Sequence, residues 1–122
     1  MKKEMKKSGF TLVEIMIVVM IIGLLAAIGI PNFLTARKNT LKKNAINNAR
    51  QVISAIDQYA MESALGANVS VAATDINQYL KGGTDGLKIG AQTAVLSGLV
   101  TDDARDATAL AASMYPNIMS LQ

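Results

Sequence analysis

An almost unbroken apolar run occupies residues 10–31 and is followed by an amphipathic stretch. An α-helix needs about 20 apolar residues to cross the hydrocarbon core of a bilayer, so the run predicts a membrane-spanning helix. Glu14 is the one carboxylate inside it. Because an ionisable side chain near a bilayer centre costs on the order of 3 kcal/mol on insertion scales, Glu14 is a candidate functional residue.

The amphipathic stretch predicts that the same helix continues with one buried face. Apolar residues recur there at three- and four-residue steps. No proline lies between Pro31 and Pro116, so we expect one helix over residues 10–64, roughly 80 Å long at 1.5 Å per residue. A domain of this size cannot cover that length, and the uncovered half must lie in a membrane or among other copies of the chain. The residues of the buried face are Leu41, Ala45, Ile46, Ala49, Val52, Ile53, Ile56 and Ala60.

Behind the long helix the pattern predicts a loop and a short helix. Residues 66–73 are small and polar, as is typical of a loop. A short helix is expected to begin at Thr74 or Asp75, which can cap it, and to end at Gly82 and Gly83.

The last part of the chain predicts a small sheet and a final helix. Residues 87–89 and 93–96 are strand candidates on either side of a glycine. Thr101 and the aspartates after it precede an alanine-rich stretch that we expect to be helical as far as Pro116. The sequence therefore predicts an α+β fold. One long N-terminal helix spans the membrane with its first half. Its second half packs against a small domain with a short helix, a short antiparallel sheet and a C-terminal helix.

Charge is concentrated at the N-terminus. Residues 1–9 carry four lysines and one glutamate, whereas basic and acidic side chains balance from Phe10 onward. A short, lysine-rich segment before an apolar run is typical of a targeting sequence, and its lysines are expected to stay cytoplasmic. An ordinary secretory signal, cut after Gly29, is the alternative. We favour a retained helix because signal sequences have shorter apolar regions and this one contains Glu14.

The chain has no cysteine and no histidine, which removes disulfides, the usual zinc ligands and the commonest general base. We therefore expect no enzyme and no cofactor; a carboxylate-dependent hydrolase using Asp102 and Asp106 is the remaining enzymatic alternative. Asp102, Asp103 and Asp106 also suggest a calcium site, but calcium needs six to eight oxygen ligands. We favour helix capping by these aspartates and expect no metal.

The segment G-F-T-L-V-E at residues 9–14 resembles the N-terminal motif of type IV pilins and of the pseudopilins of type II secretion, and the resemblance continues to about Asn39. The resemblance implies the pilin fold and cleavage between Gly9 and Phe10 by a membrane peptidase that also methylates the new N-terminus. Residues 1–9 are then a cleaved leader and residues 10–31 a transmembrane and filament-core helix. Residues 32–122 hold the amphipathic half of the helix and a small pilin domain.

The resemblance also implies roles for residues of the apolar run. Glu14 would meet the Phe10 amine of a neighbouring subunit, and pairing between subunits would set their axial register. An interfacial Glu14 that reaches the lipid head groups is the alternative. Gly23 and Pro31 would bound a helical segment that can unwind in the filament; close packing of small residues is a second, compatible interpretation.

The implied function is that of a structural subunit, polymerised with other pilin subunits into a type IV pilus-like filament or a type II secretion pseudopilus. Its partners would be the prepilin peptidase and an assembly platform in the inner membrane, where the precursor resides before it enters a periplasmic or cell-surface filament. The alternative is a membrane-anchored binding module, for instance a DNA receptor, because five basic residues could contact phosphates. We favour a head-group anchor over nucleic acid, since aromatic residues for base stacking are scarce. The basic residues are Arg37, Lys38, Lys42, Lys43 and Arg50.

Overall fold

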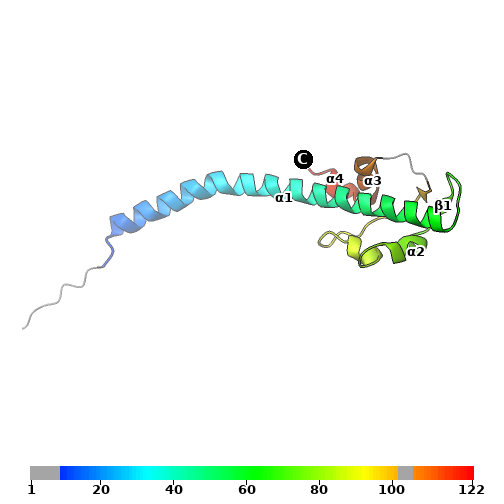
Figure 1. The fold of residues 1–122 in the computed structure, drawn as a ribbon. Helices are drawn as coiled ribbons and strands as arrows, with labels where there is room; N and C mark the ends of the chain where they lie inside the picture. The colour runs from blue at the N-terminus through cyan, green and yellow to red at the C-terminus, as the bar shows by residue number, and fades with distance from the viewer. Residues whose placement is uncertain (1–8, 102–105) are drawn as a thin grey trace, which may run out of the picture. The chain divides into compact units, whose positions relative to one another are not determined.

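The structure, a computed structural model, describes residues 9–101 and 106–122. It divides into a first compact unit that ends at Ala36 and a second, Arg37–Gln122. Helix α1, Leu12–Glu62, begins in the first unit and ends in the second (Figure 1). Its 51 residues confirm the predicted long helix, which is two residues shorter at each end than expected.

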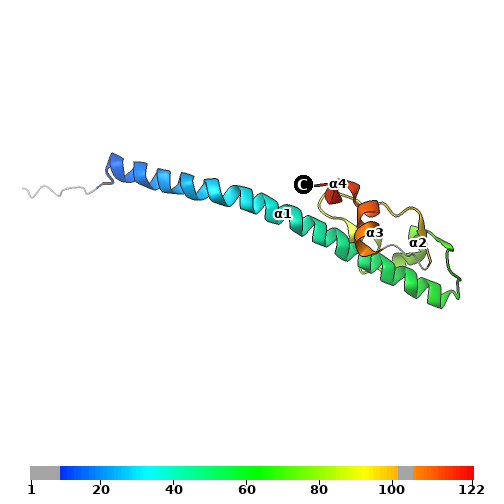
Figure 2. The ribbon, with the colours of Figure 1, turned by 90° about the horizontal axis from the view of Figure 1, so that it is seen from above.

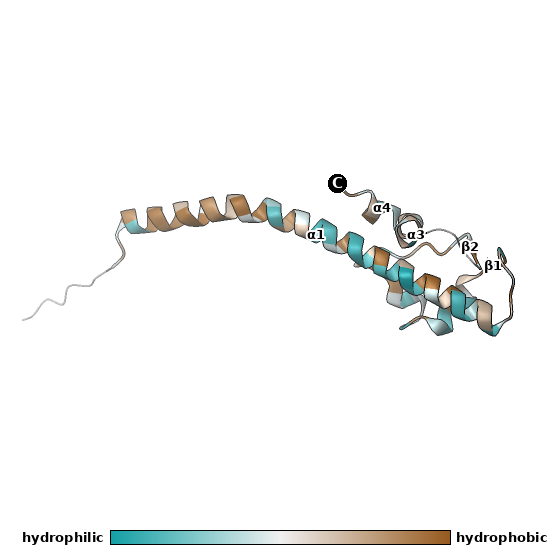
Figure 3. Ribbon diagram, turned by 45° about the horizontal axis from the view of Figure 1, so that its top comes forward, coloured by the Kyte–Doolittle hydropathy of each residue, from teal (hydrophilic) through white to brown (hydrophobic). Residues whose placement is uncertain are grey.

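The first unit exposes an apolar helix surface. In Figure 3 the first half of α1 is predominantly hydrophobic, whereas its second half alternates between hydrophobic and hydrophilic residues. Within the described chain, α1 is the one helix long and apolar enough to cross a membrane. The helix continues without interruption through Pro31, whose carbonyl accepts a hydrogen bond from Thr35 Oγ1 at 3.1 Å.

The second unit is an α+β arrangement built on the second half of α1. Figure 2 shows α2 and α4 beside this part of the helix, and in Figure 1 α3 and α4 lie on one side of α1 and α2 on the other. Its small sheet has two antiparallel strands, in which Ser70 pairs with Val100 and Val71 with Leu99. The elements after α1 are β1 (Ser70–Val71), α2 (Ala73–Ile76), the 3₁₀ helices η1 (Asn77–Tyr79) and η2 (Thr84–Leu87), β2 (Leu99–Val100), α3 (Ala107–Met114) and α4 (Pro116–Met119).

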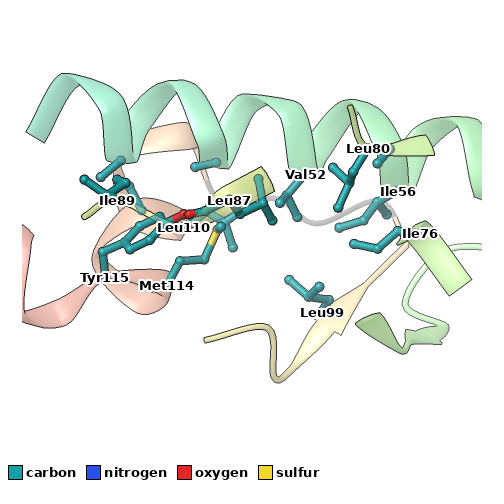
Figure 4. Packing of buried hydrophobic residues seen from close by; sticks show 14 of the residues in the cluster. Val52, Ile56, Ile76, Leu80, Leu87, Ile89, Leu99, Leu110, Met114 and Tyr115 are labelled. Atoms are coloured by element: carbon teal, nitrogen blue, oxygen red, sulfur yellow. The ribbon is translucent and has the colours of Figure 1, made fainter. Parts of the chain in front are cut away.

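The core of this unit lies against the predicted face of α1. Small residues such as Ala45 and Ala49 are fully buried there, so the short elements approach the helix backbone closely. Figure 4 shows Val52 midway between a cluster around Tyr115 and a cluster around Ile76. The buried residues of α1 are Ala45, Ala49, Val52, Ala55 and Ile56, and all except Ala55 belong to the predicted face.

The predicted strands at residues 87–89 and 93–96 are wrong. Leu87 ends η2, and Ile89 forms only an isolated bridge to Gln92. One of the actual strands, β1, lies inside the predicted loop at residues 66–73. Two-residue strands carry no alternating pattern, so their pairing depends on contacts that are remote in the sequence.

The short helix begins earlier and ends earlier than predicted. Its first residue is Ala73, and Asp75 lies at the third position, where its Oδ2 accepts a hydrogen bond from Ala72 N at 3.0 Å. The α-helix ends at Ile76 and continues as η1. Gly82 and Gly83, with φ of 82° and 66°, form the turn before η2 and do not end a helix.

The final helix is present, but its ends differ from the prediction. Asp106 caps α3, and its Oδ1 accepts a hydrogen bond from Ala109 N at 2.7 Å. Pro116 opens the separate helix α4, where a proline in the first turn loses no hydrogen bond. Thr101 is buried and holds the loop after α1, donating to the Gly66 carbonyl, so it is not a helix cap. Asp102 and Asp103 lie outside the described residues.

Candidate functional site

The predicted cleavage point lies before the first helix. Gly9 and Phe10 have no regular secondary structure, and both are exposed. The Phe10 side chain is 85% exposed. A peptide bond outside a helix and open to its surroundings can enter a peptidase active site without unfolding any element.

Glu14 and Thr11 form a reciprocal cap at the start of α1. Thr11 N donates to Glu14 Oε2 at 3.3 Å, and Glu14 N donates to Thr11 Oγ1 at 3.2 Å. These two bonds make a capping box, which satisfies two of the main-chain donors that a helix start leaves open. The carboxylate therefore lies next to the residue that follows Phe10. Sequence reasoning missed Thr11, although a threonine three residues before a glutamate is a known signal for this cap.

Apolar side chains surround this carboxylate along the helix, and all of them are exposed in the single chain. Their exposure ranges from 47% at Ile15 to 79% at Leu12. A continuous apolar surface of this kind requires lipid or other protein to cover it. The exposed large side chains of α1 up to residue 34 are Leu12, Val13, Ile15, Met16, Ile17, Val18, Val19, Met20, Ile21, Ile22, Leu24, Leu25, Ile28, Ile30, Phe33 and Leu34.

Gly23 and Pro31 both lie inside the continuous helix. A methyl group added at Gly23 would meet no atom within 4 Å, so packing inside one chain does not require glycine there. A segment that unwinds between the two residues stays a prediction for an assembled state.

The five basic residues are spread along α1 and do not form one patch. Arg37, Lys43 and Arg50 are exposed, and Lys42 is half-buried. Lys38 Nζ donates to the main-chain oxygen of Gln122 at 2.6 Å, so it holds the end of the described chain against α1. Helical geometry places residues 43 and 50 on the face opposite the core.

A polar cluster fixes the end of α3 to α1 and to η2. The Tyr115 hydroxyl donates to the Leu87 carbonyl and accepts from Asn48 Nδ2 at 3.0 Å, while Asn48 Nδ2 also lies 3.1 Å from that carbonyl. Burial raises the pKa of Tyr115 above its usual 10.0, and the hydrogen bond from Asn48 partly opposes this shift. Figure 4 shows the Tyr115 side chain among Leu87, Ile89 and Leu110. The cluster was missed because its members are far apart in the sequence.

The aspartates considered for calcium are only partly described. Asp106 caps α3, and the other two lie outside the described residues. Within residues 9–101 and 106–122, no three acidic residues lie close enough together to hold a metal ion.

Comparison with known proteins matches the N-terminal part of the chain. The profile of the family described as "Prokaryotic N-terminal methylation motif" matches residues 5–30. The type II secretion system core protein G of Vibrio cholerae serotype O1 is 35% identical over 65 residues, which are 53% of this chain and 44% of that protein. The type IV major pilin protein PilA of Myxococcus xanthus is 42% identical over 57 residues, 47% of this chain and 26% of that protein.

Residues 5–30 thus carry a prokaryotic N-terminal methylation motif, and the chain is similar to type II secretion core proteins G and to a type IV major pilin. A third relative, the type II secretion system core protein G of Escherichia coli K12, is 35% identical over 63 residues, 52% of this chain and 43% of that protein. The chain spans less than half the length of these curated relatives. No solved structure matches it.

Proposed function

We propose that this chain is a prepilin, a structural subunit that a prepilin peptidase cleaves between Gly9 and Phe10 and methylates at Phe10. The mature subunit polymerises into a type IV pilus-like filament or a type II secretion pseudopilus. The observation that carries the proposal is the uncovered apolar surface of α1, which contains the capped carboxylate of Glu14 within the matched methylation motif.

The chemistry of the helix start supports assembly through this surface. Cleavage would convert Phe10 N from an amide to an amine, and methylation leaves that amine positively charged. Glu14 lies one helical turn further on. Two buried charges cost less when they pair. An amine of one subunit that meets Glu14 of the next therefore favours one axial register among otherwise equivalent apolar contacts.

The proposal assigns a role to each part of the chain. Residues 1–9 are the cleaved leader, residues 10–31 form the transmembrane and filament-core helix, and residues 32–122 form the amphipathic half of α1 and the small pilin domain. Before assembly the subunit is a single-span protein of the inner membrane, and the basic residues between 37 and 50 contact lipid head groups. Its partners are the peptidase, the assembly platform and other pilin subunits. This role requires no catalytic centre.

Electron microscopy of cells that make the chain with a prepilin peptidase and an assembly platform tests the proposal. We expect filaments that an antibody against the second unit labels. Gly9→Val should abolish both cleavage and filaments, because a side chain at this position obstructs the peptidase. Gly66→Ala is the matched control, since a methyl group there meets no atom within 4 Å. A correctly processed protein that forms no filaments would contradict the proposal.

A further inference from the structure

One carboxylate in the second unit lacks a partner among the described residues. Five carboxylates of this unit are described, and four of them are engaged. Glu62 accepts from the Tyr79 hydroxyl, Asp75 from Ala72 N at 3.0 Å and Asp106 from Ala109 N at 2.7 Å, while Asp85 lies 3.9 Å from Lys88 Nζ. The fifth is Asp57, which is exposed on α1.

A groove on the same unit offers the opposite charge. It has a volume of about 410 Å³ and runs between α1 and the residues that follow η1. Two basic residues, Arg50 and Lys81, line it together with Ser54. Within the described chain neither cation has an ion-pair partner, since the one ion pair there joins Lys88 and Asp85. The full lining is Arg50, Gln51, Ser54, Tyr79, Leu80 and Lys81.

Within the described chain, Asp57 forms no ion pair with Arg50 or Lys81 of the groove. Arg50 and Asp57 lie seven residues apart on α1, on nearly the same face and about 10.5 Å apart along the helix axis. Both residues are exposed and lie outside the buried residues of α1. A parallel second copy that is displaced by about two helical turns would bring its Asp57 level with Arg50.

We propose that Asp57 of one copy docks into the Arg50–Lys81 groove of a second copy. The proposal rests on the proposed filament function. It adds a polar contact between the second units of two copies to the apolar contact between their helices. The contact joins different surfaces of the two copies, so the copy that supplies Asp57 keeps a free groove and the other copy keeps a free Asp57. Contacts of this kind continue into an open helical series instead of closing into a dimer, which is the symmetry that a filament requires.

Charge exchange in the full-length chain tests the contact. Asp57→Arg places like charges opposite each other, and Arg50→Asp with Lys81→Asp does the same from the other side. We expect either variant to reduce filament number about tenfold, because like charges at every subunit contact oppose assembly. The combination of all three changes should restore filaments. Asp85→Arg is the matched control, because it makes the same charge change at a residue outside the groove.

Two further measurements separate a lost contact from a misfolded variant and detect the contact directly. Unfolding of each purified variant in detergent should match wild type, because the changed side chains lie on the surface. A variant with Asp57→Cys and Lys81→Cys should form a ladder of disulfide-linked oligomers in filaments, since the natural chain has no cysteine. The groove contact is refuted if the Asp57→Arg variant forms as many filaments as wild type and the variant with two cysteines gives no ladder. The proposed function would still stand, because wild type forms filaments. Absence of wild-type filaments would overturn both.

Discussion

Thr11 and Glu14 hold each other at the start of α1, with Thr11 N 3.3 Å from Glu14 Oε2 and Glu14 N 3.2 Å from Thr11 Oγ1. The Glu14 carboxylate therefore accepts a hydrogen bond within its own chain, before any assembly. This contact leaves carboxylate capacity for a further donor, since an ionised carboxylate can accept several hydrogen bonds. Glu14 can therefore cap its own helix and still accept the amine of a neighbour.

Glu14→Gln separates the cap from the charge. The glutamine oxygen can still accept from Thr11 N, because capping boxes use either glutamate or glutamine. We expect normal membrane insertion and processing but at least about a tenfold loss of filaments, since an unpaired amine would remain buried. Filament counts by microscopy and mass spectrometry of the processed chain measure the two effects. Thr11→Ser, which keeps the cap, is the control, and filaments of the glutamine variant at the wild-type level would refute a role for the charge.

Tyr115→Phe tests the polar cluster beneath α3. It removes the donor to the Leu87 carbonyl and the acceptor for Asn48 Nδ2. We expect a loss of about 1–2 kcal/mol in the free energy of unfolding. Chemical denaturation of the detergent-solubilised chain, followed by circular dichroism, measures it. Tyr59→Phe is the control, because the Tyr59 hydroxyl has no hydrogen bond in the described part of the chain, and equal stabilities of the two variants would show that the cluster contributes nothing.

The same tyrosine predicts how stability depends on alkaline pH. Burial raises the pKa of Tyr115 above 10.0 in the folded state, so the unfolded chain loses this proton first as the pH rises. The contribution is complete below about pH 10 and is lost as the pH rises through the folded pKa. The hydrogen bond to Glu62 raises the pKa of Tyr79 too, so the comparison is between wild type and Tyr115→Phe. Wild type should lose more stability between pH 9 and pH 11, and parallel curves would contradict the prediction.

Gly86→Ala tests the close approach of Gly86, in η2, to the Lys81 carbonyl. The added Cβ would lie 2.5 Å from the Lys81 carbonyl oxygen, a main-chain atom that cannot move aside alone. We expect a destabilisation of about 1–3 kcal/mol, measured as a lower midpoint in denaturant. Gly66→Ala, where the added methyl meets no atom within 4 Å, should change the midpoint little. If both variants unfold at the same midpoint, this close contact has no energetic weight.

The sequence predicts those parts of the fold that have a periodic pattern of apolar residues. Residues 41–60 display the helical period of a buried face, and most of those positions are indeed buried or half-buried in the second unit. The strands escaped prediction because Val71 and Leu99 pair across 28 positions with only one neighbouring pair. Such short strands depend on tertiary contacts, here the main-chain and hydroxyl bonds of Thr101.

The functional residues also differ in whether the sequence alone could predict them. Glu14 was predictable because a carboxylate in an apolar run is conspicuous, and its partner Thr11 was within reach of the known capping pattern. The Asn48, Leu87 and Tyr115 cluster and the groove at Arg50 and Lys81 combine positions 28 to 67 residues apart or on different elements. No pattern along one segment signals such sites.

Intact-mass spectrometry of the chain, purified from cells that contain a prepilin peptidase, tests the central proposal most directly. We expect a protein that begins at Phe10 and carries one added methyl group. A mass that corresponds to a chain beginning at Ile30 would indicate ordinary signal cleavage after Gly29. The mass of the uncleaved chain would indicate a plain membrane anchor. Either result would contradict the proposal that this chain is a prepilin.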